Sequence, residues 1–306
     1  MTLVKYPIII FSYNRPIHLQ KSLDVLYKNK SIIHHKIFFI NDGPKNSTDR
    51  YKIKKIKKII DQYKSSINFS EVKFNKKNKG LFKNIVLNVT RILKKYKAAI
   101  ILEDDILAWN NSIEFINFFL NKEINSKNIG SVSGYSYINN IKLNKSFKLF
   151  LSKRHSSWAW GTWSRVWLKF KSEYIDGKKK NNFDVKNEDL NSLGNDMERM
   201  LWAQKNGYIN SWAVLFNYFC YKEKYRCLQP RYSLVENIGF DISGTHSSLR
   251  NIFKKNKIKK KEFNSFNYKY TFNKDIDNLI KKTHKESLKL KFFSKLNIQY
   301  LKFLKK

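Results

Sequence analysis

The feature that most constrains the fold of this 306-residue chain is a regular alternation of apolar runs and helical patterns in its first half. Runs rich in β-branched and aromatic residues predict strands at residues 7–11, 37–40, 72–74, 98–102 and 129–133. Amphipathic patterns between them predict helices at residues 18–27, 49–63, 81–96 and 112–120. Repeated strand–helix units of this length predict an α/β fold, with a doubly wound, mostly parallel sheet and helices on both faces.

The second half of the chain is less regular. It holds the aromatic segment 157–163, a helical pattern at about residues 196–205 and an aromatic-rich stretch at residues 212–225. From residue 250 onward lysines accumulate with little acidic relief. We therefore expect one domain over residues 1–250, divided near residue 135, and a basic C-terminal extension over residues 251–306.

The net charge of the chain limits the kinds of partner that it can have. It has 61 Lys and Arg residues against 24 Asp and Glu, a formal net charge of +37. Such a balance implies an anionic partner: nucleic acid, an anionic membrane or a phosphorylated substrate. Since lysine, asparagine and isoleucine are abundant throughout, a solvated basic surface explains much of the charge equally well. A hydrophobic content of 42% excludes a disordered chain.

Nothing in the sequence predicts export. The apolar run at residues 7–11 is too short for a signal-peptide core or a membrane span. Cys220 and Cys227 are the two cysteines of the chain, too few for a disulfide framework, and they fit a reducing compartment. These features predict a cytoplasmic protein.

Polar clusters follow three of the predicted strands at the point where each strand ends. They are residues 12–15 (Ser-Tyr-Asn-Arg), 41–43 (Asn-Asp-Gly) and 103–105 (Glu-Asp-Asp). One acidic turn alone is equally well a helix cap or a solvated loop. Because ligands bind beyond the carboxyl ends of parallel strands, the three clusters together predict one crevice. Adjacent carboxylates there suit Mg²⁺ or Mn²⁺, which can bridge the phosphates of a diphosphate leaving group.

The order of these motifs resembles a known family. Strand–SYNRP, strand–NDG, NKGLFKN and strand–LEDD, in this order, look like the nucleotide-binding half of glycosyltransferases with the GT-A fold. The EDD run is similar to the metal motif of N-acetylglucosaminyltransferase I and its bacterial relatives. WAWG (158–161), GNDM (194–197), NIGFD (237–241) and GTH (244–246) also resemble that group. The resemblance covers residues 5–250 and implies a GT-A-type sheet, with residues 1–135 binding nucleotide and residues 136–250 holding the acceptor and catalytic groups.

Carried over residue by residue, the resemblance implies a donor site. The residues that it assigns to the nucleotide-sugar are Ser12, Asn14, Arg15, Asp42, Gly80 and Asp104. Asp42 would bond the base, Gly80 would let the backbone approach, and Asp104 would face the ribose or sugar. Asp105 would be the direct ligand of Mn²⁺ or Mg²⁺. His246 is a second candidate ligand, although a lone histidine in a glycine-bearing loop is more typical of a structural hydrogen-bonding group.

The resemblance also matches Asp196 to the catalytic base. Inverting transfer needs one carboxylate that takes the proton from the attacking acceptor hydroxyl. Asp196 stands at the start of a predicted helix, so an N-cap is the competing interpretation. Glu188 and Asp189 are the alternative bases, and a retaining reaction is the alternative where no carboxylate reaches the acceptor.

Tryptophans in the second half fit sugar recognition. Flat rings contact the apolar C–H faces of sugars, and Trp158 and Trp160 are predicted to offer such faces. Large aromatic residues are more often packed than displayed, and for Trp163 and Trp167 we expect a place in the core.

The end of the chain has a basic amphipathic pattern. Apolar residues recur at positions 288, 292, 296, 300 and 304, with lysines between them. A helix of this kind lies on an anionic bilayer or docks on the core of its own domain, and the sequence leaves both open. The membrane alternative would place the protein on the cytoplasmic face of the inner membrane.

The sequence therefore predicts a metal-dependent, inverting glycosyltransferase, hexosyl- or N-acetylhexosaminyl-, with a UDP-sugar donor. The expected acceptor is a hydroxyl of a cell-surface glycan (lipopolysaccharide or capsule) or a lipid-linked glycan. The alternatives are a nucleic-acid-binding protein and a nucleotidyltransferase. No recognised nucleic-acid module occurs, and the turn after the first strand lacks the glycine-rich loop typical of nucleotidyltransferases.

Overall fold

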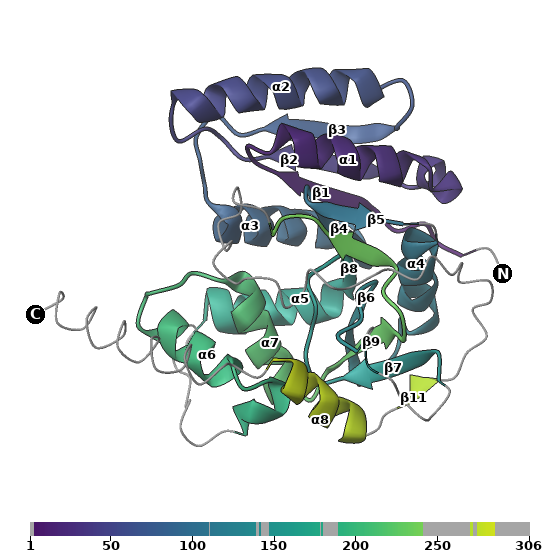
Figure 1. The fold of residues 1–306 in the computed structure, drawn as a ribbon, viewed down its shortest axis with the longest axis vertical. Helices are drawn as coiled ribbons and strands as arrows, with labels where there is room; N and C mark the ends of the chain where they lie inside the picture. The colour runs from purple at the N-terminus through teal and green to yellow at the C-terminus, as the bar shows by residue number, and fades with distance from the viewer. Residues whose placement is uncertain are drawn as a thin grey trace, which may run out of the picture.

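The computed structural model describes residues 3–109, 111–138, 141, 147–177, 179, 189–240, 270–271 and 274–284. Over these residues nine strands form one mixed sheet, in the order β11-β7-β9-β6-β8-β4-β1-β2-β3 (Figure 1). The strands are β1 (Ile8–Ser12), β2 (Ile37–Asn41), β3 (Phe69–Phe74), β4 (Ala98–Glu103), β6 (Ile129–Ser133), β7 (Leu149–Ser152), β8 (Trp160–Trp163), β9 (Arg226–Pro230) and β11 (Tyr270–Thr271). A separate pair is made by β5 (Ile106–Ala108) and β10 (Val235–Asn237).

Helices cover both faces of this sheet. They are α1 (Pro16–Tyr27), α2 (Ser47–Tyr63), α3 (Leu81–Leu93), α4 (Ser112–Lys122), α5 (Ser164–Phe170), α6 (Met197–Lys205), α7 (Trp212–Lys222) and α8 (Lys274–Thr283), with the short helices η1 (Lys30–His34), η2 (Lys171–Ile175) and η3 (Leu190–Leu193). Helix α1 contacts α2, and α1 and α4 both contact η1, whereas α3 contacts α5 and α7. The predicted α/β class with a mostly parallel sheet is confirmed.

Four neighbouring parallel strands of the sheet, β4, β1, β2 and β3, come from the first half of the chain. Strand β1 pairs in parallel with β2 and β4, and Ile8 lies opposite both Ile37 and Ile100. All five residues of β1 are buried, because neighbouring strands cover its edges and helices cover its faces. Helix α1 begins at Pro16, a residue whose fixed φ suits the first turn and whose missing N–H costs no hydrogen bond there.

An antiparallel strand interrupts the sheet. Strand β8 lies between β4 and β6 and runs opposite to both. Its Trp163 is fully buried and donates its indole N–H to the carbonyl of Leu120 at 2.9 Å. Trp167, on α5, is also buried and donates to Thr90 Oγ1 at 3.0 Å. The core positions predicted for these two tryptophans are confirmed.

Residues 270–271 and 274–284, which the sequence places in a basic extension, take part in the fold. Strand β11 lies at one edge of the sheet and pairs with β7, and α8 packs against β7 and η3. Ile276 and Ile280 of α8 form a small apolar cluster with Ile138 and Phe150. The amphipathic pattern of residues 288–306 and the second candidate metal ligand His246 lie outside the described residues. Within the described residues, no helix is both long and apolar enough to span a membrane.

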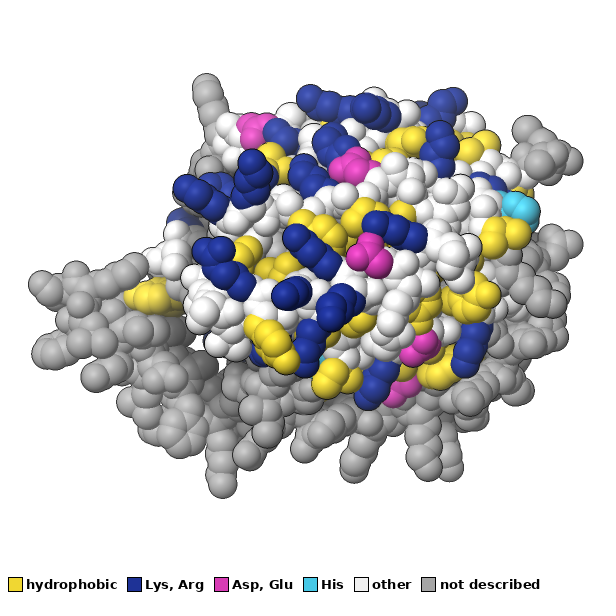
Figure 2. All heavy atoms as spheres, turned by 90° about the horizontal axis from the view of Figure 1, so that it is seen from above, with side chains coloured by type: hydrophobic (Ala, Val, Ile, Leu, Met, Phe, Trp, Pro, Cys, Tyr) yellow, Lys and Arg dark blue, Asp and Glu magenta, His cyan; other side chains and the backbone are white. Residues whose placement is uncertain are grey.

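The positive charge is carried by the surface. The face seen from above, over α2 and β3, displays many Lys and Arg side chains and few acidic ones (Figure 2). Helix α2 turns Ile53, Ile56 and Ile60 inward and leaves most of its lysines exposed. The solvated basic surface that the composition allows is therefore present on this face.

Candidate functional site

The predicted crevice lies where the order of the strands reverses. From β1 the chain moves to β2 and β3 on one side, and then returns to place β4 on the other side of β1. The carboxyl ends of β1 and β4 therefore lie next to each other, and no crossover connection joins these two strands directly. In an open parallel sheet, ligands usually bind at such a reversal of strand order. The polar clusters at residues 12–15 and 103–105 meet at this point.

Asp104 ties the two strand ends together. Its Oδ2 accepts hydrogen bonds from the hydroxyl of Ser12 at 2.9 Å and from the amide of Tyr13 at 3.1 Å. Its backbone carbonyl accepts a third bond, from the hydroxyl of Ser22 in α1, at 2.8 Å. The Asp104 carboxylate is buried and its orientation is set by the end of β1.

Asp105 pairs with Arg15 and is covered by a later segment. One guanidinium nitrogen of Arg15 lies 2.7 Å from Asp105 Oδ2, and both side chains are about six-sevenths buried, with 14% and 16% exposed. The pairing of β10 with β5 brings residues 237–240 over the site, and the amide of Ile238 donates to the Asp105 carbonyl at 2.9 Å. A Cβ atom placed on Gly239 would lie 2.0 Å from Asp105 Oδ2. A side chain at this position would therefore displace the Asp105 carboxylate or the backbone above it.

The acidic cluster carries more negative charge than its protein neighbours neutralise. Burial, with repulsion from the adjacent carboxylates, raises the pKa of Glu103 and of Asp104 well above the ordinary carboxyl range. Burial also raises the pKa of Asp105, although the Arg15 guanidinium opposes that shift. A bound cation would offset the repulsion among these carboxylates. The carboxylate oxygens of the cluster therefore suit a divalent metal.

The cation would have few protein ligands. No group of three or more His, Cys, Asp and Glu side chains that could hold a metal ion occurs in the part of the chain that the structure describes. A Mg²⁺ or Mn²⁺ site with one or two carboxylates is still complete when substrate phosphates and water supply the other oxygens. Asp105, predicted as this ligand, lies just after β4 (Ala98–Glu103) and is paired with Arg15.

Asp42 organises the loop that leads into α3. Its carboxylate accepts hydrogen bonds from the amides of Gly43, Lys79 and Gly80 at 2.9 Å, and from the Asn75 side chain at 3.2 Å. Gly80 has a positive φ of 76° and caps α3, a conformation that glycine adopts without strain. Asp42 and Gly80, predicted separately, are thus directly bonded. A contact of Asp42 with a base would form beside these bonds.

Asp49 was missed by the sequence reasoning. Its carboxylate accepts hydrogen bonds from the hydroxyl of Tyr13, from the Asn14 side chain at 2.7 Å and from the Lys45 amide at 3.0 Å. Burial would raise the pKa of Asp49, but these hydrogen bonds outweigh it and the pKa is lowered. Asp49 thus fixes the loop that carries Asn14. The available signal was the capping pair Asn46 and Asp49, whose amide bonds Asn46 Oδ1 at 2.9 Å.

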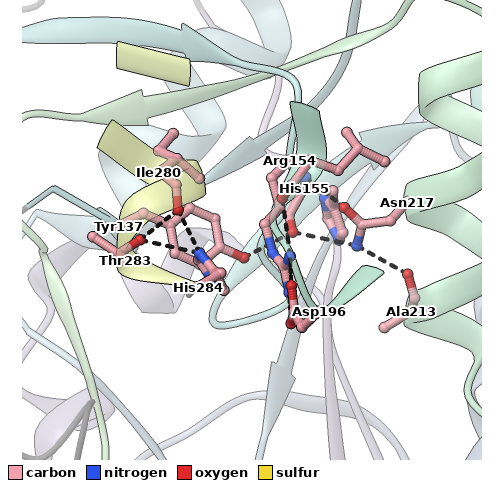
Figure 3. A network of polar contacts seen from close by, with 10 residues as sticks. Tyr137, Arg154, His155, Asp196, Ala213, Asn217, Ile280, Thr283 and His284 are labelled. Atoms are coloured by element: carbon pink, nitrogen blue, oxygen red, sulfur yellow. Dashed lines mark hydrogen bonds and ion pairs between the residues drawn. The ribbon is translucent and has the colours of Figure 1, made fainter. Parts of the chain in front are cut away.

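Asp196 lies in a second cluster, at the start of α6. Arg154 donates two hydrogen bonds to its carboxylate, at 2.7 Å and 2.9 Å (Figure 3). His284, just after α8, packs beside this pair. Burial alone would raise the pKa of Asp196, but the Arg154 guanidinium outweighs burial and the pKa is lowered. Asp196 occupies the N-cap position of α6, as the competing interpretation expects, but its side chain makes no cap hydrogen bond.

A row of aromatic rings joins the two clusters. Phe240, next to Gly239, meets Trp158 at 5.4 Å, Trp158 meets Tyr135 at 4.3 Å, and Tyr135 meets Tyr137 at 5.3 Å between ring centroids. Tyr137 lies 5.8 Å from the Arg154 guanidinium. Trp158 is partly buried within this row, between Phe240 and Tyr135.

The prediction that Trp160 offers a ring face to a sugar is wrong. Trp160 is fully buried, stacks on Trp212 at 5.1 Å and also contacts Trp167, Phe216 and His155. It lies within β8, opposite Ile101 of β4, where helices cover the sheet. The WAWG segment thus divides into Trp158 beside the site and Trp160 in the core.

The structure brings four predicted residues into one cluster: Ser12, Arg15, Asp104 and Asp105. Asn14 adjoins them through Asp49, and Asp42 and Gly80 form a neighbouring pair at the end of β2. Of the alternative bases, Glu188 lies outside the described residues, and Asp189 begins η3 with its backbone carbonyl bonded to the hydroxyl of Ser192.

Comparison with known proteins places this geometry in context. No protein-family model matches the chain, and no curated protein matches its sequence. Among solved structures, S. aureus TarS 1–349 in complex with UDP is similar, with a TM-score of 0.41, 13% identity, and coverage of 90% of this chain and 64% of that chain. GalNAc-T7 with UDP, GalNAc and Mn²⁺ gives a TM-score of 0.46 at 10% identity, covering 75% of this chain and 43% of that chain.

A cytidylyltransferase from Leptospira borgpetersenii is also similar, with a TM-score of 0.34 at 10% identity over 56% of this chain and 65% of that chain. The chain spans 35–64% of the length of the TarS structures that it matches. At this distance the likeness concerns the fold alone.

Proposed function

We propose that this protein is a metal-dependent, inverting glycosyltransferase that uses a nucleotide-diphosphate sugar, with UDP as the nucleotide. The observation that carries the proposal is the buried cluster of Arg15, Asp104 and Asp105 at the reversal of strand order between β1 and β4. The acceptor is a hydroxyl of a cell-surface or lipid-linked glycan, and the sugar is a hexose or an N-acetylhexosamine.

On the donor side, each group has a task that its position supports. Asp104, held by Ser12 and Tyr13, is oriented to accept hydrogen bonds from ribose or sugar hydroxyls. Asp105 holds the divalent cation, which when bound neutralises charge on the diphosphate. Arg15, which pairs with Asp105, adds positive charge where the phosphates would lie.

In the transfer, the acceptor oxygen forms a bond to the anomeric carbon while the bond from that carbon to the diphosphate oxygen breaks. The electron pair of the broken bond leaves with the nucleoside diphosphate. The proton of the acceptor hydroxyl passes to the carboxylate of Asp196. Attack from the face opposite the leaving group inverts the anomeric configuration.

The first prediction concerns donor binding. A thermal-shift panel of UDP, GDP and CDP, each with and without Mn²⁺, should show stabilisation by UDP only when Mn²⁺ is present. Ligand at about 100 times its Kd stabilises by about 2.7 kcal/mol, enough for a clear shift. Asp105→Asn should abolish the metal-dependent shift, because it removes the charged ligand.

Asp61→Asn is the matched control, since Asp61 is an exposed carboxylate at the end of α2 that pairs with Lys64. It should bind UDP and Mn²⁺ like the wild type. A chain that no nucleotide stabilises, or an Asp105→Asn variant that keeps the full shift, would contradict the proposal.

A further inference from the structure

The cluster around Asp196 draws its residues from widely separated parts of the chain. Arg154 lies between β7 and β8, Asp196 begins α6, His284 follows α8, and Tyr137 follows β6 (Figure 3). The side chains of Arg154 and Asp196 are only 10% and 18% exposed. Burying a charged pair at this depth is costly unless its geometry is good and its remaining hydrogen bonds are satisfied. The contacts of Arg154 and Asp196 meet both conditions.

Arg154 is held in one orientation. Its NH1 group donates to Asp196 Oδ1 at 2.7 Å and also to the Leu193 carbonyl at 2.9 Å, while NH2 donates to Asp196 Oδ2 at 2.9 Å. The guanidinium also lies 5.8 Å from the centre of the Tyr137 ring. Two parallel bonds fix the plane of the carboxylate as well as its position, and a lysine ammonium cannot reproduce them.

Gly194 leaves the room that this arrangement needs. Its φ is 132°, which L side chains rarely adopt, and a Cβ atom there would lie 2.5 Å from Arg154 NH1 and 2.8 Å from Asp196 Oδ1. The Cβ atom of His284 would be 3.0 Å from it on another side. The loop before α6 therefore packs directly between Arg154 and the end of α8.

Helix α8 closes the cluster from outside. The His284 ring meets Tyr137 edge-on at 4.7 Å, and its Nδ1 donates to the Ile280 carbonyl at 2.9 Å. The helix is anchored by Asp277, whose carboxylate accepts from the Lys153 amide at 3.2 Å and pairs with Arg226 at 3.3 Å. Lys153 is the neighbour of Arg154, so the anchor of α8 and the partner of Asp196 share one stretch of backbone.

We infer that Arg154 is a positioning residue for Asp196 and that α8, through Asp277 and His284, holds this pair in place on the acceptor side of the site. The inference rests on the proposed role of Asp196 as the base. It extends the site to residues 274–284, beyond the part of the chain where the sequence motifs end.

The pairing is compatible with proton transfer. Each carboxylate oxygen has a second lone pair that the Arg154 bonds leave available, and the Asp196 side chain keeps some exposure through which a hydroxyl can approach. Arg154, His284 and, behind Arg154, Tyr137 are the titratable groups that face this carboxylate. Burial and the Arg154 charge lower the pKa of His284 to about 4, so near pH 7 the arginine is the cation in contact with Asp196.

The first test is the pH profile of transfer. Arg154→Met removes the charge that keeps Asp196 ionised, so the acidic limb of kcat/KM should move upward by roughly 1–3 pH units. A merely structural role would lower activity at every pH and leave the limb in place, and that result would overturn the inference. Arg154→Lys keeps a charge without the two-bond geometry, so it should lower kcat with a smaller displacement of the limb.

The second test does not need activity. In a double-mutant cycle of Arg154→Met and Asp196→Asn, the urea midpoint should fall in each single variant and recover in the double variant, which buries no unpaired charge. The matched control is Arg91→Met, which breaks a two-bond pair with Glu71 on α3 and β3. Additive shifts across the Arg154–Asp196 cycle would overturn the inference even if the protein proves not to be a transferase.

The third test addresses α8. Asp277→Asn loosens the anchor, so kcat should fall several-fold while the KM for the nucleotide-sugar and the thermal shift by UDP and Mn²⁺ stay unchanged. A raised donor KM with unchanged kcat would assign α8 to the donor side and overturn its placement here. Loss of nucleotide binding in the wild type would instead count against the proposed function.

Discussion

Gly239 lies so close to Asp105 that a side chain at this position would press on the Arg15–Asp105 pair. Gly239→Ala would place a methyl group 2.0 Å from Asp105 Oδ2, so residues 237–240 must shift or the Arg15–Asp105 pair must open. Overpacking of this kind costs about 1–3 kcal/mol in unfolding free energy. We also expect the metal-dependent shift by UDP to be lost, as measured by thermal denaturation with and without both ligands.

Gly207→Ala is the control for that variant. Gly207 has a φ of 74° but no atom within 4 Å of the position of a Cβ, so it tests backbone strain without a clash. Strain of this kind costs about 1–2 kcal/mol and should leave nucleotide binding intact. If Gly239→Ala binds UDP like the wild type, residues 237–240 do not cover Asp105 as described.

The positions of single site residues were predictable where those residues directly follow a strand. Ser12, Arg15, Asp104 and Asp105 could be placed together from the sequence, since parallel strands bring their carboxyl ends to one edge. Arg154 and His284 were not singled out for Asp196, because their contacts join segments 42 and 88 residues away along the chain. No local pattern encodes such a contact. Trp160 was misplaced because its segment gives no sign of which ring faces inward.

At the scale of elements, α8 depends on a small apolar cluster of its own. Ile280 is 1% exposed and packs with Ile276, Ile138 and Phe150, apart from the main core. Ile280→Ala should lower the unfolding free energy by about 2–5 kcal/mol in urea denaturation. Lys282→Ala, on the exposed side of the same helix, should change it by less than about 0.5 kcal/mol. Equal effects in the two variants would mean that α8 is not packed by this face.

Elements of the first half were predicted closely, and in the second half the helix predicted at about residues 196–205 agrees with α6 (Met197–Lys205). The strand at residues 129–133 and the starts of α3, β4 and α4 agree with the structure, because buried β-branched runs and amphipathic patterns are local signals. Strand β8 was not predicted, since four residues with three aromatic or threonine side chains fit a helix, a loop or a strand. Its direction is set by pairing with β4 and β6, which the sequence does not display.

For the molecule as a whole, buried histidines link stability to pH. His284 has its pKa lowered from 6.5 to about 4, first by burial and then by Arg154. Below pH 6.5 the unfolded chain binds a proton that the folded chain does not, so His284 costs stability as pH falls from about 6.5 towards 4. The raised pKa values of Glu103 and Asp104 act in the opposite direction. The contribution of His284 must therefore be measured as the difference in unfolding free energy between the wild type and a His284 variant.

We expect His284→Asn to be less stable than the wild type at pH 7. The difference in unfolding free energy between the two proteins should be smaller by about 2 kcal/mol at pH 5. Urea denaturation at both pH values measures the gap. A gap that widens as the pH falls would mean that folded His284 takes up a proton more readily than the unfolded chain, against the burial seen here.

Strand β8, which runs antiparallel to both of its neighbours β4 and β6, has a consequence for how this molecule could diversify. A parallel strand offers a ligand the residues at its exit, whereas β8 offers the residues at its entrance, 154–158, to the same edge. Under the proposed function, the exits of β1 and β4 would contact the donor and residues 154–158 would face the acceptor. We therefore expect substitutions before β8 to change the choice of acceptor while donor binding stays the same.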